Sequence, residues 1–136
     1  MIIAIDDTDP RPIYQQIVDE VRRGMVVGAL AADEPLPSVR QLAADLSVNP
    51  NTVQQAYREL EREGLAYVRR GQGTYVAPLR DGGAARERSR VAATVAQRAL
   101  LEARRNGLDA EELIEAIRNA GNGADPEEAG GNGRKR

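Results

Sequence analysis

Residues 36–64 read LPSVRQLAADLSVNPNTVQQAYRELEREG, and this stretch predicts two helices joined by a tight turn. Ser38 and Gln41 have the spacing of a capping box, in which the Ser38 hydroxyl accepts the Gln41 backbone N–H and the Gln41 side chain reaches back. The helix that begins there is expected to bury its apolar side chains, which are Leu42, Ala43 and Leu46. Ser47 and Val48 then turn the chain.

The second helix of this stretch has a defined start and a defined end. Asn49 is expected as its N-cap, and Pro50 occupies the first helical position, where no intrahelical N–H bond is needed. Gly64 is expected as its C-cap glycine. The residues that recur at helical spacing form its inner stripe: Val53, Ala56, Tyr57 and Leu60. Two short helices with this connection are typical of a helix-turn-helix.

Another helix is predicted upstream of this pair. Ile2, Ile3 and Ile5 first form a short β-like run, and the sequence Asp9-Pro10-Arg11-Pro12 interrupts it. The helix that follows ends at Gly28, and its apolar residues are Ile13, Ile17, Val21 and Met25, with Tyr14 and Val18 beside them. This spacing is typical of a helix that packs on a hydrophobic core.

A β-hairpin is predicted downstream of the helix pair. Two strand-like segments, 65–68 and 74–76, are joined by Arg69-Arg70-Gly71-Gln72-Gly73. Glycines between β-branched and aromatic residues are typical of such a turn. Tyr67 in this hairpin and Tyr57 in the preceding helix are interpreted as core aromatics whose hydroxyl groups reach water. The order of elements predicts an N-terminal winged helix-turn-helix in a chain of the α+β class that is mostly helical.

The alanine-rich residues after position 85 predict two further helices. Residues 86–105 form the first, and a second, opened by a capping box from Asp109 to Glu112, reaches about residue 120. Two helices of this size cannot bury their apolar faces on each other alone, so residues 86–120 are assigned to dimerisation across a two-fold axis. The alternative is that both helices dock on the first domain of the same chain. The candidate dimerisation residues are Val91, Val95, Leu100, Leu113, Ile114 and Ile117.

The sequence therefore predicts four parts. Residues 1–78 form the winged helix-turn-helix domain, residues 79–85 a linker, residues 86–120 the dimerisation segment and residues 121–136 a tail. The tail contains almost no apolar residues, so it is expected to be disordered. Its cationic end, Arg134-Lys135-Arg136, is expected to be a solvated terminus.

The composition excludes several classes of functional site. The chain has 136 residues, with 19 Lys and Arg, 21 Asp and Glu, and no Cys, His, Trp or Phe. Without Cys and His the chain has no disulfide, cysteine nucleophile, Cys/His zinc site or Ser-His-Asp triad. The sequence also has no G-x-x-x-x-G-K-[ST] phosphate loop and no G-x-G-x-x-G fingerprint. Enzymatic activity and a cofactor are therefore not expected.

Charge and hydropathy bear on location and partners. No apolar run reaches about 18 residues and no secretory signal is recognisable, so a soluble cytoplasmic protein without membrane contact is expected. Residues 35–80 hold six cations and four anions, net +2, whereas residues 1–34 hold three and seven, net −4. The central segment favours a polyanionic partner, and the acidic start keeps open a winged-helix module that binds protein and not DNA.

Three separated blocks resemble a known family. PIYQQI (12–17), the stretch 36–64 and RRGQGTYV (69–76) resemble the DNA-binding domain of GntR-type bacterial transcriptional regulators. MIIAID (1–6), VNPNTV (48–53) and the short C-terminal part are similar to the YtrA-type subgroup. The resemblance implies a homodimeric winged-helix repressor that binds a two-fold symmetric operator in double-stranded DNA. It also implies that no large effector pocket is present, and it leaves a small-molecule effector open.

Two positions depart from the family pattern. The family usually has Pro-Gly in the turn before LPS, where this chain has Ala32 and Asp33, and Asp tolerates turn conformations. The family often carries a basic residue early in the third helix, where this chain has Gln54 and Gln55. The second departure concerns the operator sequence and not the ability to bind DNA.

The candidate base-reading residues lie on the third helix, away from its core stripe. They are Asn51, Thr52, Gln54, Gln55 and Arg58. Asn and Gln can bond adenine through two hydrogen bonds and Thr can contact a thymine methyl group, which favours A·T pairs in each half-site. The alternative is a neutral polar surface without a ligand. Phosphates would repel Glu59, Glu61 and Glu63, so the second half of the helix is expected to point away from DNA.

Further DNA contacts are expected from the helix starts and the hairpin loop. Ser38 and Asn49 stand at two helix starts, and Arg40 lies in a first turn, where it either reaches the operator or pairs with Asp45. The hairpin loop contributes a possible minor-groove wing consisting of Arg69, Arg70, Gly71, Gln72 and Gly73. The two arginines are expected on opposite strand faces, so one contacts DNA, and the resemblance points to Arg70. The alternative is a charge pair that guards a strand edge.

Overall fold

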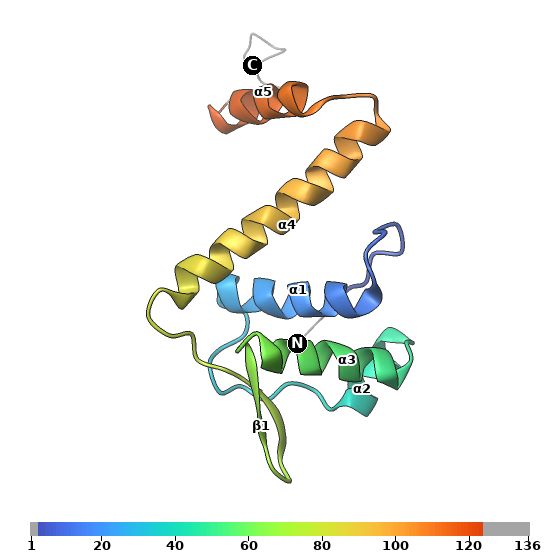
Figure 1. Cartoon of the computed structure of the whole chain (residues 1–136), viewed down its shortest axis with the longest axis vertical. Coiled ribbons are helices and arrows are strands. Elements are labelled where there is room, and N and C mark those ends of the chain that lie inside the picture. The colour runs from blue at the N-terminus through green and yellow to red at the C-terminus, as the bar shows by residue number, and fades with distance from the viewer. Residues whose placement is uncertain (1–2, 124–136) are drawn as a thin grey trace. The chain divides into compact units, whose positions relative to one another are not determined.

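The computed structural model describes residues 3–123, which form five helices and a two-stranded sheet (Figure 1). In chain order the elements are α1 (Ile13–Val27), α2 (Val39–Leu46), α3 (Pro50–Arg62), β1 (Ala66–Arg69), β2 (Gly73–Val76), α4 (Gly83–Arg105) and α5 (Ala110–Gly121). The chain divides into two compact units, Met1–Thr94 and Val95–Arg136, and the boundary falls within α4. The prediction of a mostly helical α+β chain with an N-terminal winged helix-turn-helix is confirmed.

Side chains cap both helices of the helix-turn-helix. The Ser38 Oγ accepts the backbone N–H of Gln41 at 3.1 Å, and the Asn49 Oδ1 accepts that of Asn51 at 2.8 Å. Each bond satisfies an N–H group that lacks an intrahelical partner, which defines where α2 and α3 begin. The predicted capping box at Ser38 is wrong in its second half. The Gln41 side chain donates to Asp45, one turn ahead at 2.8 Å, and therefore does not reach back.

The predicted ends of α1 and α3 are confirmed. Pro50 is the first residue of α3, and Gly64, which follows the C-cap Glu63, has a φ of 77°. Gly28 ends α1 with a φ of 83°. Glycine adopts this left-handed conformation without the steric cost that a Cβ atom brings, so both helices end where the sequence places a glycine.

The hydrophobic core of the first unit involves α1, α2, α3 and the hairpin. The predicted inner stripe of α3 is completely buried, and Ile17, Val18 and Val21 of α1 are buried with it. The predicted stripe of α1 is wrong at its start, because Ile13 is the first helical residue and is 38% exposed. The other buried apolar residues of this core are Leu30, Leu36, Leu42, Ala43, Leu65, Ala66 and Val76.

The β-like run expected at the start of the chain does not form a strand. Ile3 and Ile5 lie in an irregular segment and pack against the core, whereas Ile2 lies outside the described residues. Residues 33–36 occupy the edge of β2 opposite β1, through three backbone hydrogen bonds of 2.8 to 2.9 Å. The segment that completes this edge therefore comes from the loop between α1 and α2.

The hairpin follows α3 directly. Its antiparallel register pairs Tyr67 with Tyr75 and Arg69 with Gly73, and residues 70–72 connect the strands. In Figure 1 the hairpin extends beyond α3 on the side away from α1. Within the first unit, the hairpin therefore has the position of a wing beside the helix-turn-helix.

Both predicted C-terminal helices are present. Helix α4 begins at Gly83, so it includes part of the segment 79–85 that was predicted as a linker. The predicted capping box of α5 is confirmed, because Asp109 Oδ1 accepts the Glu112 N–H at 2.8 Å and Glu112 Oε1 accepts the Asp109 N–H at 3.0 Å. No helix within residues 3–123 is both long and apolar enough to cross a membrane.

The predicted tail lies almost entirely beyond the described residues. Gly121 is the last residue of α5, and the description ends at residue 123. The expected disorder of residues 121–136 therefore falls outside the described residues from position 124 onward, as do Arg134, Lys135 and Arg136.

Candidate nucleic-acid interface

The first turns of α3 present a polar face to solvent. Four of the five predicted base-reading residues are exposed and Thr52 is half-buried; the exposed ones are Asn51, Gln54, Gln55 and Arg58. Their side chains form no hydrogen bond or ion pair with another residue of the described chain. The opposite side of α3 is packed into the core. Because the side chains of the exposed face have no partner among the described residues, their donors and acceptors are available for a ligand.

The second half of α3 carries carboxylates that arginines of the same unit engage. Arg62 Nε donates to Glu59 at 3.0 Å, and this bond lowers the pKa of Glu59 to about 2. Arg22 of α1 donates to Glu63, whose pKa is raised because the carboxyl group is partly buried. Two of the three carboxylates in this half, Glu59 and Glu63, are therefore paired with arginines of the protein itself, whereas Glu61 is exposed and has no partner among the described residues.

The start of α2 offers one unpaired cation. Arg40 is exposed and forms no ion pair with a described residue, and Asp45, its predicted alternative partner, accepts from Gln41 instead. Ser38 and Asn49 each use an oxygen as a cap acceptor, which leaves the Ser38 O–H and the Asn49 amide N–H groups as donors. Donors of this kind beside helix N-termini are suited to phosphate oxygens.

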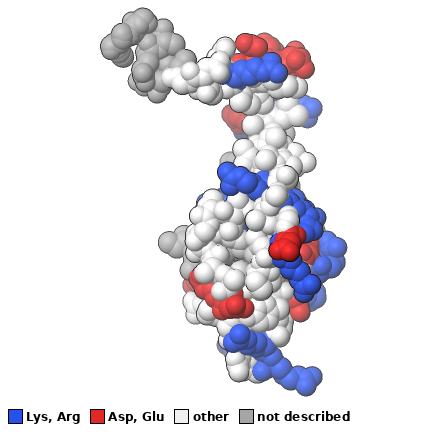
Figure 2. Space-filling view, turned by 90° about the vertical axis from the view of Figure 1, so that its left-hand side faces the viewer, with Lys and Arg blue, Asp and Glu red and all other residues white. Residues whose placement is uncertain are grey.

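The tip of the hairpin presents a second unpaired cation. Arg70, Gly71 and Gln72 are exposed, and Arg70 has no hydrogen bond or ion pair with a residue in the described range. Gly71 has a φ of 77°, which allows the tight turn at the tip. Figure 2 shows cationic side chains at this end of the first unit. The guanidinium group of Arg70 is therefore available to phosphates or to the minor groove.

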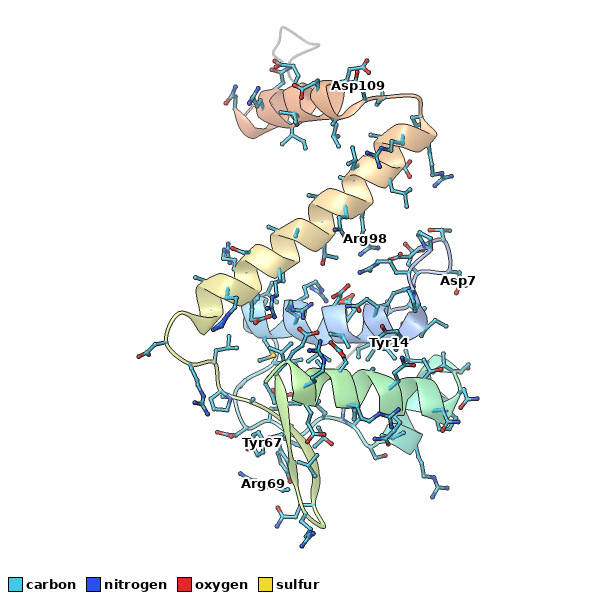
Figure 3. The ribbon with its side chains drawn as sticks, in the orientation of Figure 1. Asp7, Tyr14, Tyr67, Arg69, Arg98 and Asp109 are labelled. Atoms are coloured by element: carbon cyan, nitrogen blue, oxygen red, sulfur yellow. The ribbon has the colours of Figure 1, made fainter. Side chains whose placement is uncertain are left out.

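Arg69 has a different environment from its neighbour Arg70. Its guanidinium carbon lies 4.6 Å from the centre of the Tyr75 ring and 5.7 Å from that of Tyr67. Its Nη2 also donates to the Tyr67 hydroxyl at 3.3 Å. Figure 3 shows Tyr67 and Arg69 on the same side of the hairpin. Of the two predicted wing arginines, Arg69 is stacked on aromatic rings and Arg70 is not.

The sequence interpretation of two tyrosines needs correction. Tyr67 is not a core residue: it is half-buried on the hairpin, and its hydroxyl donates to Asp33 Oδ1 at 2.5 Å. Tyr57 is buried as predicted, but its hydroxyl donates to the Pro37 carbonyl oxygen at 2.6 Å and so does not depend on water. Burial raises the pKa of Tyr57 above its ordinary value.

Asp33, Tyr67 and Tyr75 are the residues of this region that sequence reasoning missed. Tyr67 and Tyr75 are each four positions from Gly71, and this symmetry was a signal that they face each other across the hairpin. For Asp33 the signal was its place in a turn where the GntR pattern has glycine. Asp33 has a φ of 67°, in the left-handed region that favours glycine.

The candidate dimerisation residues are incompletely covered within their own chain. All six are exposed or half-buried: Val91, Val95, Leu100, Leu113, Ile114 and Ile117. The exposed fractions reach 60% for Val95 and 56% for Ile117. Leu101 and Leu108, which the prediction omitted, are also exposed. The core of their own chain therefore leaves these apolar side chains partly or largely uncovered.

Comparison with known proteins relates this fold to a bacterial family. The family described as "Bacterial regulatory proteins, gntR family" matches residues 13–76. The HTH-type transcriptional repressor YtrA of Bacillus subtilis is 45% identical over 76 residues, which cover 56% of this chain and 58% of that protein. The uncharacterized HTH-type transcriptional regulator YhcF of the same organism is 48% identical over 67 residues, or 49% and 55% of the two chains. The matches thus span little more than half the length of these relatives.

Solved structures extend the similarity into the C-terminal helices. A GntR family transcriptional regulator from Listeria monocytogenes has a TM-score of 0.63 and 33% identity, with 85% of this chain and 98% of that chain covered. YtrA from Sulfolobus acidocaldarius, a GntR-family transcription factor, has a TM-score of 0.56 and 35% identity, with 71% and 98% covered. The chain belongs to the GntR family of bacterial regulatory proteins and is similar to its YtrA-type members.

Proposed function

We propose that this protein is a sequence-specific DNA-binding regulator of transcription that acts as a homodimeric repressor at an inverted-repeat operator. The observation that carries the proposal is the unengaged polar face on the first turns of α3. In a helix-turn-helix the second helix enters the major groove, and its N-terminal residues contact the base edges. In this chain α3 is that helix, and its exposed side chains are of the types that read bases.

Each of the five candidate base-reading residues of α3 has a chemical role in this proposal. Asn51 and Gln54 can each form two hydrogen bonds with adenine, and Thr52 can contact a thymine methyl group. Gln55 and Arg58 extend the contacts to neighbouring bases or phosphates. These residue types favour A·T pairs within each half-site.

Two unpaired cations flank α3 and position the protein on the DNA backbone. Arg40 at the start of α2 is suited to a phosphate, and Arg70 at the hairpin tip is suited to a phosphate or to the minor groove. Ser38 and Asn49 add neutral donors at the helix starts. Contacts of this kind set register and orientation, whereas α3 supplies the base preference.

A second copy of the chain is the proposed partner of the exposed apolar residues in α4 and α5. Val95, Ile114 and Ile117 are exposed in one chain, and a two-fold pairing would cover the same residues of both copies. A dimer of this type places two recognition helices about 34 Å apart, one turn of DNA, so the operator should be an inverted repeat.

Repression would follow from occupation of a promoter. The YtrA relative of Bacillus subtilis is named a transcriptional repressor, and the same role is proposed here. A bound dimer would exclude RNA polymerase from overlapping sites. This role places the protein with the chromosome, in the cytoplasm.

Selection of bound duplexes from a random DNA library by the full chain tests the proposal. Sequencing should show enrichment of an inverted repeat whose half-site centres lie about one helical turn apart. A folded protein that enriches no motif would contradict the proposal and would favour a winged-helix module that binds protein. Enrichment of a single half-site would retain DNA recognition but contradict the homodimeric repressor.

A further inference from the structure

Three side chains on one face of the hairpin, Tyr67, Arg69 and Tyr75, interact with one another, and Tyr67 also contacts Asp33 of the loop between α1 and α2; these four residues are here called the wing ladder. Tyr67 and Tyr75 lie opposite each other, with ring centres 5.7 Å apart and ring planes inclined by 21°. Arg69 lies over the Tyr75 ring at 4.6 Å, within the range of a cation–π interaction. Stacking thus joins Arg69, the last residue of β1, to both strands of the hairpin.

Hydrogen bonds connect the wing ladder to the loop between α1 and α2. The Tyr67 hydroxyl accepts from Arg69 Nη2 at 3.3 Å and donates to Asp33 Oδ1 at 2.5 Å. The bond to Asp33 raises the pKa of Tyr67 above its ordinary value. The Asp33 backbone N–H in turn donates to the Val76 carbonyl oxygen at 2.8 Å. The wing ladder therefore runs from a loop bound to the sheet up to the edge of the hairpin tip.

Two local features permit this arrangement. Gly73 faces Arg69 in the register and has no side chain, so Arg69 can lie over Tyr75, its diagonal neighbour. Asp33 occupies a left-handed turn position, with a φ of 67°, that would favour glycine on steric grounds. Its carboxylate gives this position a use that glycine could not provide, namely an acceptor for Tyr67.

We propose that Arg69 is a positioning residue of the wing, held by Tyr67 and Tyr75, with Tyr67 bonded to Asp33, and that Arg70 is the wing arginine that binds DNA. The proposal rests on the DNA-binding function proposed above. A hairpin with two four-residue strands has little independent stability. A wing that is ordered before binding loses less conformational freedom when it enters a groove, so the wing ladder raises affinity without touching the ligand.

The salt dependence of DNA binding separates the two arginines, with the duplex enriched by the selection experiment as the probe. Arg70→Gln should reduce the slope of log K against log salt by about 0.9, because one phosphate contact is lost. Arg69→Gln should weaken binding by about three- to tenfold with an unchanged slope, because only the order of the wing is lost. Arg88→Gln is the matched control: Arg88 is an exposed arginine of α4 outside the proposed interface, and its removal should change neither quantity.

Two variants test the wing ladder without removing a cation. Tyr67→Phe keeps the ring and removes the hydroxyl, whereas Asp33→Gly suits the turn and removes the carboxylate. Both should weaken binding with an unchanged salt slope. Tyr67→Phe combined with Arg69→Gln should bind about as weakly as Arg69→Gln alone, because both act on one structure. Arg69→Lys keeps the charge but loses the planar stacking group, so it should resemble Arg69→Gln.

Several results would overturn the proposal. If Arg69→Gln reduced the salt slope as much as Arg70→Gln, or if Arg69→Lys bound like the wild type, Arg69 would be a phosphate-binding charge. Without DNA, the hairpin amides should exchange hydrogen faster in Tyr67→Phe and Arg69→Gln than in the wild type, and unchanged exchange would also overturn it. Failure of the wild-type protein to bind DNA would contradict the proposed function, and the exchange rates would then decide separately whether the wing ladder orders the hairpin.

Discussion

The Nε atom of Arg22 in α1 donates to Oε1 of Glu87 in α4 at a distance of 2.9 Å, and the two residues are only 5% and 4% exposed. Arg22 also donates to Asp19 at 2.9 Å and to Glu63 at the end of α3. The Nη1 atom of Arg90 lies 3.4 Å from Oε1 of Glu63 and 3.4 Å from Oε2 of Glu87. A buried arginine with three carboxylate partners therefore connects α1, α3 and the first turns of α4 within the first unit.

Removal of Arg22 should destabilise the first unit strongly. Arg22→Ala removes the buried cation that Asp19, Glu63 and Glu87 share and leaves the more exposed Arg90 beside Glu63 and Glu87. Loss of one partner from a buried cluster costs about 3–5 kcal/mol. Arg23→Ala is the matched control, because Arg23 is exposed and pairs with Glu20 at the surface, where a pair contributes about 1 kcal/mol or less. Urea unfolding, followed by circular dichroism at a fixed protein concentration, measures the free energy of unfolding of both variants. Equal losses of unfolding free energy in the two variants would show that the buried cluster stabilises the fold no more than a surface ion pair does.

This cluster also shows where prediction from the sequence ends. Ser38, Asn49 and Gly64 act on backbone groups within three residues of themselves, so the helix limits that they set could be predicted from local sequence. Arg22 and Glu87 are 65 positions apart, and each appears in the sequence as an ordinary charge on an amphipathic helix. Only packing of the folded chain brings the two residues together. Nothing in the sequence therefore indicated that the start of α4 belongs to the first unit, and the segment 79–85 was predicted as a linker although α4 begins at Gly83.

The same distinction applies to the candidate interface. The exposed face of α3 could be predicted because the 3.6-residue period that places Tyr57 in the core leaves Gln54 on the outside. The bond between Asp33 and Tyr67 could not, because it joins positions 34 residues apart through a loop whose path depends on the whole fold. Ile5 shows the same limit, since its β-like pattern gave no sign that another segment pairs with β2.

The buried hydroxyl of Tyr57 should make the fold less stable at alkaline pH. Burial raises its pKa in the folded protein above the unfolded value near 10, so the folded state holds this proton more tightly. The contribution of the protonated Tyr57 to the free energy of unfolding is fully present below a pH of about 10 and is lost as the pH rises further. Tyr57→Phe removes this titration, so its free energy of unfolding should decline less above pH 10 than that of the wild type.

Urea unfolding of both proteins at several pH values from neutral to alkaline tests this expectation. At neutral pH the variant should be less stable by about 1 kcal/mol, because the Pro37 carbonyl oxygen loses its donor. The difference should then shrink as the pH rises above about 10. A constant difference across the range would contradict the assignment of the alkaline loss to Tyr57.

Ile117→Glu should dissociate the proposed dimer. Ile117 is 56% exposed in one chain, and a carboxylate at this place would be buried without a partner in a dimer that covers it. A cost of about 3–5 kcal/mol weakens self-association by more than about a hundredfold. Sedimentation velocity should show a monomer for this variant and a dimer for Glu115→Ala, which changes an exposed polar residue of the same helix. Dimers of equal stability in both variants would contradict the proposed role of α5.

The central claim is that the exposed face of α3 reads bases. The most direct test is to rank operator duplexes by their affinity for the Gln54→Ala protein and to compare that order with the order for the wild type. Affinities for a set of duplexes, each with one changed base pair in the enriched operator, should be measured for the wild type, Gln54→Ala and the control Glu61→Ala. The account predicts that Gln54→Ala loses about 1–3 kcal/mol of discrimination at one position of each half-site. Glu61→Ala should keep the wild-type ranking. A ranking that is unchanged in Gln54→Ala would contradict the placement of α3 in the major groove.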